Sequence, residues 1–186
     1  METEEIREKK EPKRLPVWAC ILLFALGLFV CMGLYGTIGF GLLSLILGDE
    51  ARHPGLLVYT VTEANMLLSV LTPAVILLYF ERRPFSDLGL TLKGHVRGLW
   101  YGLLVAMLLY LIGFGLSLAI GEVEVTGFQF DPLNLLGTFV FCLLVALTEE
   151  IMMRGYILGR LLHTRMNKFL ALFVSALLFA LLHIFN

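Results

Sequence analysis

Charged residues are scarce in this sequence. Of its 186 residues, 16% are charged and 59% are hydrophobic, and the mean hydropathy is +0.87. Soluble domains carry roughly 25% charged residues, so the composition excludes an ordinary soluble domain and indicates an integral membrane protein. We expect an all-α, polytopic membrane fold. The net charge of −1 carries little information, because charges in membrane proteins act through their positions.

Several common sequence signatures are also missing. Cys20, Cys31 and Cys142 show no disulfide or zinc spacing, and we expect them to be buried, inert thiols. The sequence has no H-E-x-x-H zinc helix, phosphate loop or dinucleotide fingerprint. It has no basic, aromatic-interleaved surface, which excludes a nucleic-acid partner. The first apolar run is far longer than the core of a signal peptide, so we expect it to stay as a membrane anchor.

Long apolar runs dominate the chain instead. About 20 residues span the hydrocarbon core. The first run, uncharged throughout, is too long for one straight span and too short for two spans with a turn, so we expect one tilted or kinked helix there. The sequence predicts about five transmembrane helices, with more in the full-length protein. Their expected ranges are 15–48, 56–80 with a kink at Pro73, 98–120, Leu133 through the acidic pair at 149–150, and Phe169 to Asn186.

The basic residues predict the orientation of these helices. Thirteen of the 14 Lys and Arg residues precede the first run or lie near the second and fourth connections, and Arg52 lies on the opposite side. This alternation follows the positive-inside rule. We therefore expect a multi-pass protein of the cell membrane with a cytoplasmic N-terminus. Residues 1–14 are expected to form a disordered polar tail, and residues 15–186 one membrane domain.

The stretch LTEEIMMRGY, residues 147–156, places two acids and a base at the end of an apolar run. A charge at mid-bilayer costs about 2.5–3.5 kcal/mol on insertion scales. Glu150 and Arg154 are four residues apart, so they lie on one helical face and can pair. Glu149 is rotated by about 100° from Glu150 and has no evident partner on its own helix.

His183 is the predicted partner of Glu149. The turn of the last hairpin is centred between Arg165 and Met166. Glu149 and His183 each lie about 25 Å from this turn along antiparallel helices. Phe179 lies one turn from His183 on the same face. A carboxylate and an imidazole at equal depth are a plausible pair for activating water, in which the base takes a proton as water attacks a carbonyl.

Other readings of these residues stay open. The Glu150–Arg154 pair is also explained by helix positioning, and a single membrane histidine is often a packing residue. Glu63 is interpreted as an interfacial residue. His53 and His95 are expected in solvated loops, and the spacing His163-x-x-x-Asn167 falls in the turn, away from the acids.

Two motifs carry a family resemblance. Residues 149–154 match E-E-x-x-x-R, and residues 179–183 match F-x-x-x-H. Together they resemble the CPBP family, which includes CAAX proteases and bacteriocin-processing or immunity proteins. The diagnostic part covers residues 133–186, and the looser stretch RPFSDLGL extends the resemblance to residue 82 at most.

The resemblance implies a CAAX-protease-like intramembrane endopeptidase acting on a membrane-embedded or membrane-associated peptide or protein. It implies that Glu149 is the base and His183 its partner, with Glu150, Arg154 and Phe179 in support. Some members of the family are described as metalloproteases and others as glutamate-dependent. If a divalent metal such as zinc is bound, Glu149 and His183 are its expected ligands, although they form an incomplete set.

One motif of the family does not occur after the second motif in this sequence. Members carry a later H-x-x-x-N or H-x-x-x-D motif on a span beyond the second motif, whereas this sequence ends at Asn186. We therefore expect the sequence to be part of a longer protein, and this part alone to be inactive. The same residues are also compatible with two other functions: a non-enzymatic bacteriocin-immunity or peptide-sequestering membrane protein, and a proton-coupled carrier.

Overall fold

The computed structural model describes residues 15–52, 55–91 and 93–184, and these residues form helices and connections without a strand. The predicted polar tail at 1–14 and His53 lie outside the described residues. The all-α prediction is confirmed. The helices are α1 (Val17–Leu47), η1 (Gly48–Arg52), α2 (Leu56–Phe80), η2 (Phe85–Leu88), α3 (Val96–Ala119), α4 (Pro132–Glu150), η3 (Ile151–Leu158), α5 (Gly159–Leu162) and α6 (Lys168–Leu182).

Four helical stretches are long and apolar enough to cross a membrane: α1, α2, α3 and the continuous rod formed by α4, η3 and α5. The first run forms one helix, as predicted, and α2 has its predicted bounds and runs unbroken through Pro73. The fifth predicted span is shorter than expected. Helix α6 has 15 residues, about 22 Å of helix. It ends before His183, whose backbone N–H closes a tighter turn onto the Ala180 carbonyl.

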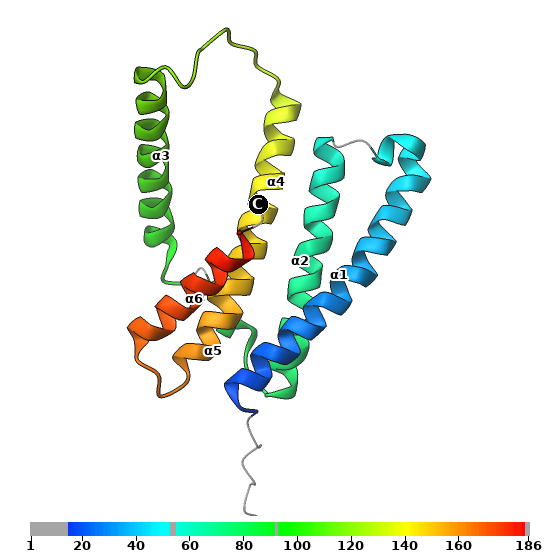
Figure 1. Cartoon of the computed structure of the whole chain (residues 1–186), viewed down its shortest axis with the longest axis vertical. Coiled ribbons are helices and arrows are strands. Elements are labelled where there is room, and N and C mark those ends of the chain that lie inside the picture. Colours follow the sequence, from blue (N-terminus) through cyan, green and yellow to red (C-terminus); the bar gives the residue numbers. More distant parts are fainter. Residues whose placement is uncertain (1–14, 53–54, 92, 185–186) are drawn as a thin grey trace, which may run out of the picture.

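The helices form a bundle with one outlying member (Figure 1). Helix α1 packs along α2, and α2 packs against α4. Gly27 of α1 permits a close approach, because a Cβ atom there would lie 2.8 Å from the Pro73 side chain of α2. Helix α3 stands apart and buries none of its side chains. The protein core therefore lies among α1, α2 and the part of the last hairpin formed by η3, α5 and α6.

The core is concentrated near the end of the bundle where α1 begins and α2 ends. Phe24 of α1 and Leu78 of α2 meet Ile151 and Tyr156 of η3 there, together with Leu88 of η2. This packing brings α1, α2 and η2 from the first half of the chain against η3 from the second half. The position of η3 is thus fixed by residues from three other elements, α1, α2 and η2.

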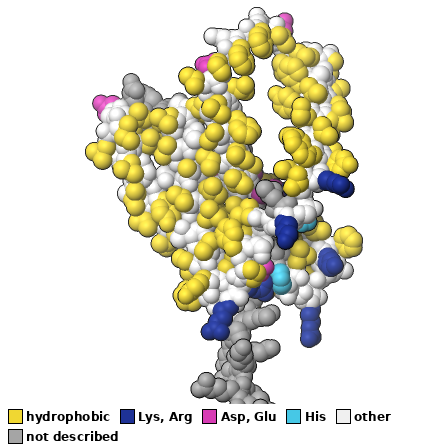
Figure 2. All heavy atoms as spheres, turned by 180° about the vertical axis from the view of Figure 1, so that it is seen from behind, with side chains coloured by type: hydrophobic (Ala, Val, Ile, Leu, Met, Phe, Trp, Pro, Cys, Tyr) yellow, Lys and Arg dark blue, Asp and Glu magenta, His cyan; other side chains and the backbone are white. Residues whose placement is uncertain are grey.

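The outer surface is apolar, as expected for helices surrounded by lipid. Figure 2 shows hydrophobic side chains over the helices, with Lys and Arg gathered toward the end where α1 begins. The cysteines correct one expectation: Cys20 is buried, but Cys31 is half-buried and Cys142 is exposed. An apolar run has the same composition whether a given face meets protein or lipid, so the sequence alone did not separate the three.

Candidate active site

Two caps define the hairpin that carries the candidate site. The Asp131 side chain accepts hydrogen bonds from the backbone N–H groups of Leu133 and Asn134, at 3.0 and 3.1 Å, at the start of α4. The Asn167 side chain accepts one from the Phe169 N–H, at 2.9 Å, at the start of α6. Both are typical N-terminal caps. They set where each arm of the hairpin begins.

The turn between the arms explains the H-x-x-x-N spacing without catalysis. The His163 Nδ1 atom donates to the Gly159 carbonyl, at 2.6 Å, and Asn167 is the cap of α6. The Thr164 hydroxyl donates to the Leu161 carbonyl, also at 2.6 Å. These are local bonds that satisfy helix-end carbonyls and N–H groups. They leave His163 and Asn167 outside the candidate site, in agreement with the sequence interpretation.

A π-helix directly follows the acidic pair, and sequence reasoning missed it. Element η3 covers residues 151–158, including Arg154. Such wide turns are rare and are frequent at functional sites. A contact of Gly155 accompanies it, because a Cβ atom there would lie 2.6 Å from the Leu88 carbonyl oxygen. Gly155 was the available signal, since it lets the backbone of η2 press against η3.

Helix α6 is attached to η3 by one buried hydrogen bond. The Ser175 hydroxyl donates to the Met153 carbonyl across the hairpin, at 3.3 Å. Both residues are buried. The bond lies between the tips of the hairpin and its turn, and it fixes the register of α6 against η3. That register decides which residue of α6 faces Glu149.

Glu149 and His183 face one another in the structure. The Glu149 Oε1 atom lies 3.4 Å from the His183 Nε2 atom, within ion-pair distance, and the side chains are 36% and 39% exposed. The equal depth predicted from the length of the hairpin arms matches this geometry. Their catalytic role stays a prediction, which the geometry permits.

The other ring nitrogen of His183 is also engaged. Its Nδ1 atom lies 3.0 Å from the Phe179 carbonyl oxygen, and because a carbonyl accepts, Nδ1 is the donor. The Phe179 ring packs on the imidazole with its centroid 4.5 Å away. Nε2 then meets Glu149 either as an N–H donor or as an acceptor from a protonated carboxyl group. The pair is therefore arranged to hold one proton between its two members.

Glu150 and Arg154 form an ion pair with each other, separate from the contact between Glu149 and His183. The pairing follows the four-residue spacing. The Glu150 and Arg154 side chains are 51% and 69% exposed, so each keeps access to its surroundings. Exposed pairs of this kind contribute about 0–1 kcal/mol to stability. The pair neutralises its charges without being sealed inside the protein.

A cavity of about 300 Å³ lies between η3 and α6, beside these residues. This volume is at the lower end of the range for ligand pockets. Its wall combines charged groups with apolar side chains, and His183 borders Glu149 at its edge. The lining residues are Glu149, Glu150, Met153, Arg154, Leu158, Leu172, Ser175, Ala176 and Phe179. A substrate segment entering here would meet the Glu149 carboxylate.

The donor set beside the cavity is incomplete for zinc. In the described parts of the chain, no three His, Cys, Asp or Glu residues are grouped so that they could hold a metal ion. Structural and catalytic zinc sites use at least three protein ligands. Glu149 and His183 together supply two. These residues alone do not fit a resident zinc ion.

Comparison with known proteins bears on this hairpin. No curated protein matches the chain significantly, and no solved structure does. Residues 131–186 match the family described as "Type II CAAX prenyl endopeptidase Rce1-like". The matched segment starts at the Asp131 cap and contains Glu149 and His183. The resemblance seen in the two motifs is thus confirmed for this segment: residues 131–186 are similar to the Rce1-like type II CAAX prenyl endopeptidases.

Proposed function

We propose that the protein is a CAAX-protease-like membrane endopeptidase that hydrolyses a peptide bond of a membrane-associated substrate. One observation carries the proposal. Within the segment that matches the Rce1-like family, a glutamate and a histidine lie 3.4 Å apart beside a cavity. An intramembrane acid that is not consumed by a structural ion pair is a functional candidate by default.

In the proposed reaction, Glu149 is the general base. A water molecule in the cavity gives a proton to the Glu149 carboxylate while its oxygen attacks the carbonyl carbon of the scissile peptide. The C–N bond of the tetrahedral intermediate then breaks, and the proton passes to the leaving amine. His183, held through its Nδ1 donor bond to Phe179, keeps Glu149 oriented.

Glu150 and Arg154 play a supporting part in this proposal. Their mutual ion pair prevents Arg154 from pairing with Glu149, which would weaken that carboxylate as a base. The negative oxygen of the intermediate also requires a hydrogen-bond donor, worth about 10²–10³ in rate.

The proposed orientation places the N-terminus in the cytoplasm. Basic side chains gather toward the end of the bundle where α1 begins, as the positive-inside rule requires of a cytoplasmic face (Figure 2). The turn between α5 and α6 lies at the same end of the bundle (Figure 1). A substrate anchored in the inner leaflet would reach the cavity from that side.

Substitution of the pair tests the function. In the full-length protein, Glu149→Gln and His183→Ala should each abolish cleavage of a membrane-anchored reporter peptide, followed by mass spectrometry. Insertion and abundance should stay near wild type. Glu124→Gln is the matched control, because Glu124 lies in the exposed connection between α3 and α4. Cleavage that survives Glu149→Gln contradicts its assignment as the base.

The same variants separate the alternatives. If resistance to a toxic peptide survives both substitutions, a sequestering or immunity protein explains the chain better. Loss of proton-coupled uptake in the variants would favour a carrier. A divalent metal such as zinc is the alternative activator only if ligands from outside the hairpin complete the set that Glu149 and His183 begin. Its test is cleavage after chelation, followed by metal re-addition.

A further inference from the structure

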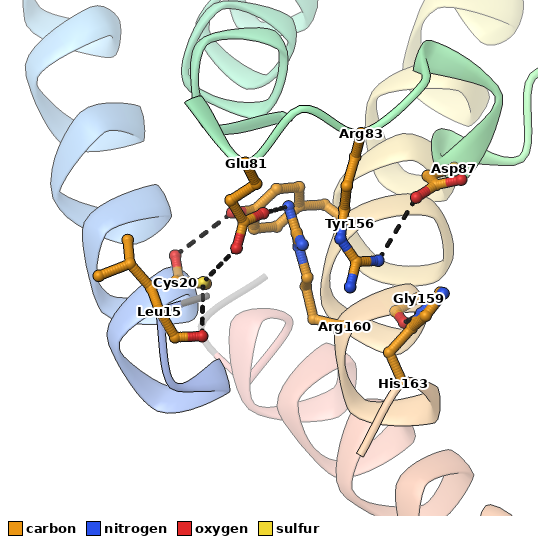
Figure 3. A network of polar contacts seen from close by, with 9 residues as sticks. All are labelled: Leu15, Cys20, Glu81, Arg83, Asp87, Tyr156, Gly159, Arg160 and His163. Atoms are coloured by element: carbon orange, nitrogen blue, oxygen red, sulfur yellow. Dashed lines mark hydrogen bonds and ion pairs between the residues drawn. The ribbon is translucent and has the colours of Figure 1, made fainter. Parts of the chain in front are cut away.

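A second cluster of polar side chains lies near the end of the bundle where α1 begins. Glu81, which follows the last residue of α2, forms an ion pair with Arg160 of α5. Figure 3 shows the two side chains pointing toward each other from separate elements. Their side chains are 8% and 5% exposed. Charges are rarely buried so completely unless they are paired.

Further contacts tie this pair to α1. The Cys20 thiol donates to Glu81 Oε1, at 3.1 Å, and the Tyr156 hydroxyl lies 3.5 Å from the Cys20 carbonyl oxygen, to which it donates. The Arg160 guanidinium lies over the Tyr156 ring, 5.0 Å from its centroid. The same ring stacks on Phe24 of α1 at 4.3 Å. Elements α1, α2, η3 and α5 are thereby joined in one closed set of contacts (Figure 3).

The proposed reaction uses none of these groups. Arg160 is eleven residues beyond Glu149 in the numbering, about 16 Å along a helix. A nearby pair, Arg83 with Asp87 at 3.4 Å, joins residues four apart in one short segment and is more exposed, at 17% and 27%. The Glu81–Arg160 pair differs because it connects the first two helices to the rod that carries the acids.

We propose that Glu81 and Arg160 are positioning residues for the candidate active site. Their buried pair connects the α1–α2 hairpin to η3 and α5, and so sets the rotation and depth of the rod that presents Glu149 to His183. This inference rests on the proposed endopeptidase function. It assigns a part in that function to Arg160, inside the segment matched to the Rce1-like family, and to Glu81, which precedes that segment, residues 131–186.

The route from the pair to the site runs through η3. Tyr156, under the Arg160 guanidinium, belongs to the π-helix that begins immediately after Glu150. Ser175 holds α6 to the same π-helix through the Met153 carbonyl. Rotation of η3 therefore moves Glu149 and shifts α6, which His183 directly follows. A pair that makes contact at 3.4 Å is sensitive to such a change.

The kinetic test uses charge removal, charge conservation and charge exchange in the full-length protein. Glu81→Gln should lower kcat by about 100-fold, the scale of a 1 Å misplacement at a reacting centre, while KM stays near wild type. Arg160→Lys should retain part of the activity. The exchange Glu81→Arg with Arg160→Glu should recover activity relative to either single change. Arg83→Gln, the control in the more exposed pair, should leave kcat unchanged.

A second measurement does not depend on proteolysis. Cys20 is 1% exposed in the folded protein, so N-ethylmaleimide should modify it slowly, as followed by mass spectrometry of the tryptic peptides. Glu81→Gln should speed this modification, and the charge exchange should slow it again. Cys142, which is exposed, is the internal reference for reagent access. This readout reports directly whether α1 has separated from the rod.

The two measurements separate the possible failures. If the wild type cleaves its reporter and Glu81→Gln has the same kcat per folded molecule, the positioning role is wrong. An unchanged rate of Cys20 modification in Glu81→Gln also contradicts it. If Glu81→Gln speeds Cys20 modification but the wild type cleaves no reporter, the endopeptidase proposal fails while the connection between α1 and the rod stands.

Discussion

Two arginines of one helical rod pair with glutamates in opposite surroundings. Arg154 pairs with Glu150 beside the cavity, where the side chains are 69% and 51% exposed. Arg160 pairs with Glu81 one to two turns further on, where they are 5% and 8% exposed. The chemistry of the two pairs is the same, so burial separates their effects. The open pair neutralises charge near the reaction, and the buried pair fixes the position of the rod.

The largest expected effect is a loss of folding free energy when the arginine of the buried pair is replaced. Arg160→Met leaves Glu81 buried and unpaired, and removing one partner of a buried pair costs about 3–5 kcal/mol of folding free energy. Arg154→Met leaves Glu150 about half exposed rather than sealed inside the protein, so the loss should be smaller than in Arg160→Met. Both values are measured by denaturant titration in detergent micelles. Equal losses in the two variants would mean that burial does not distinguish the pairs.

A smaller effect tests the backbone contact beside both pairs. Gly155→Ala would place a Cβ atom 2.6 Å from the Leu88 carbonyl oxygen, so η2 and η3 must separate. Overpacking of this kind costs about 1–3 kcal/mol. Gly113→Ala on α3 is the control, because no atom lies within 4 Å of a Cβ there. Thermal unfolding should show a lower Tm for Gly155→Ala and an unchanged Tm for Gly113→Ala. A similar fall in Tm in both variants would show that the close approach of η2 to Gly155 is not the cause.

The part of the fold that sequence predicted well is the part set by hydropathy. The predicted bounds 56–80 are those of α2, and the third span, predicted at 98–120, occupies 96–119. The meeting of Glu149 and His183 was also predictable. It depends on the equal lengths of two helical arms around one turn.

The buried cluster was not predictable in the same way. Arg160 was counted among the basic residues that set the orientation, yet its side chain lies inside the protein. Its partner Glu81 is 79 positions away in the numbering, and no local pattern marks such a contact. The π-helix was missed for a related reason. Its apolar sequence fits an ordinary helix, and its contacts with η2 and α6 are tertiary.

The smallest expected effect sharpens the comparison at the point where the rod meets α6. Ser175→Ala removes the buried hydroxyl that donates to the Met153 carbonyl, with a loss of about 0.5–1.5 kcal/mol. Thr37→Ala is the control, since its hydroxyl bonds to the Gly33 carbonyl within α1 and is exposed. If the bond across the hairpin sets the register of α6, reporter cleavage should fall in Ser175→Ala by more than its folded fraction and stay unchanged in Thr37→Ala. A fall in cleavage that only matches the folded fraction would show that the caps and the turn hold His183 opposite Glu149 without Ser175. The bond would then stabilise the hairpin without aligning its two arms.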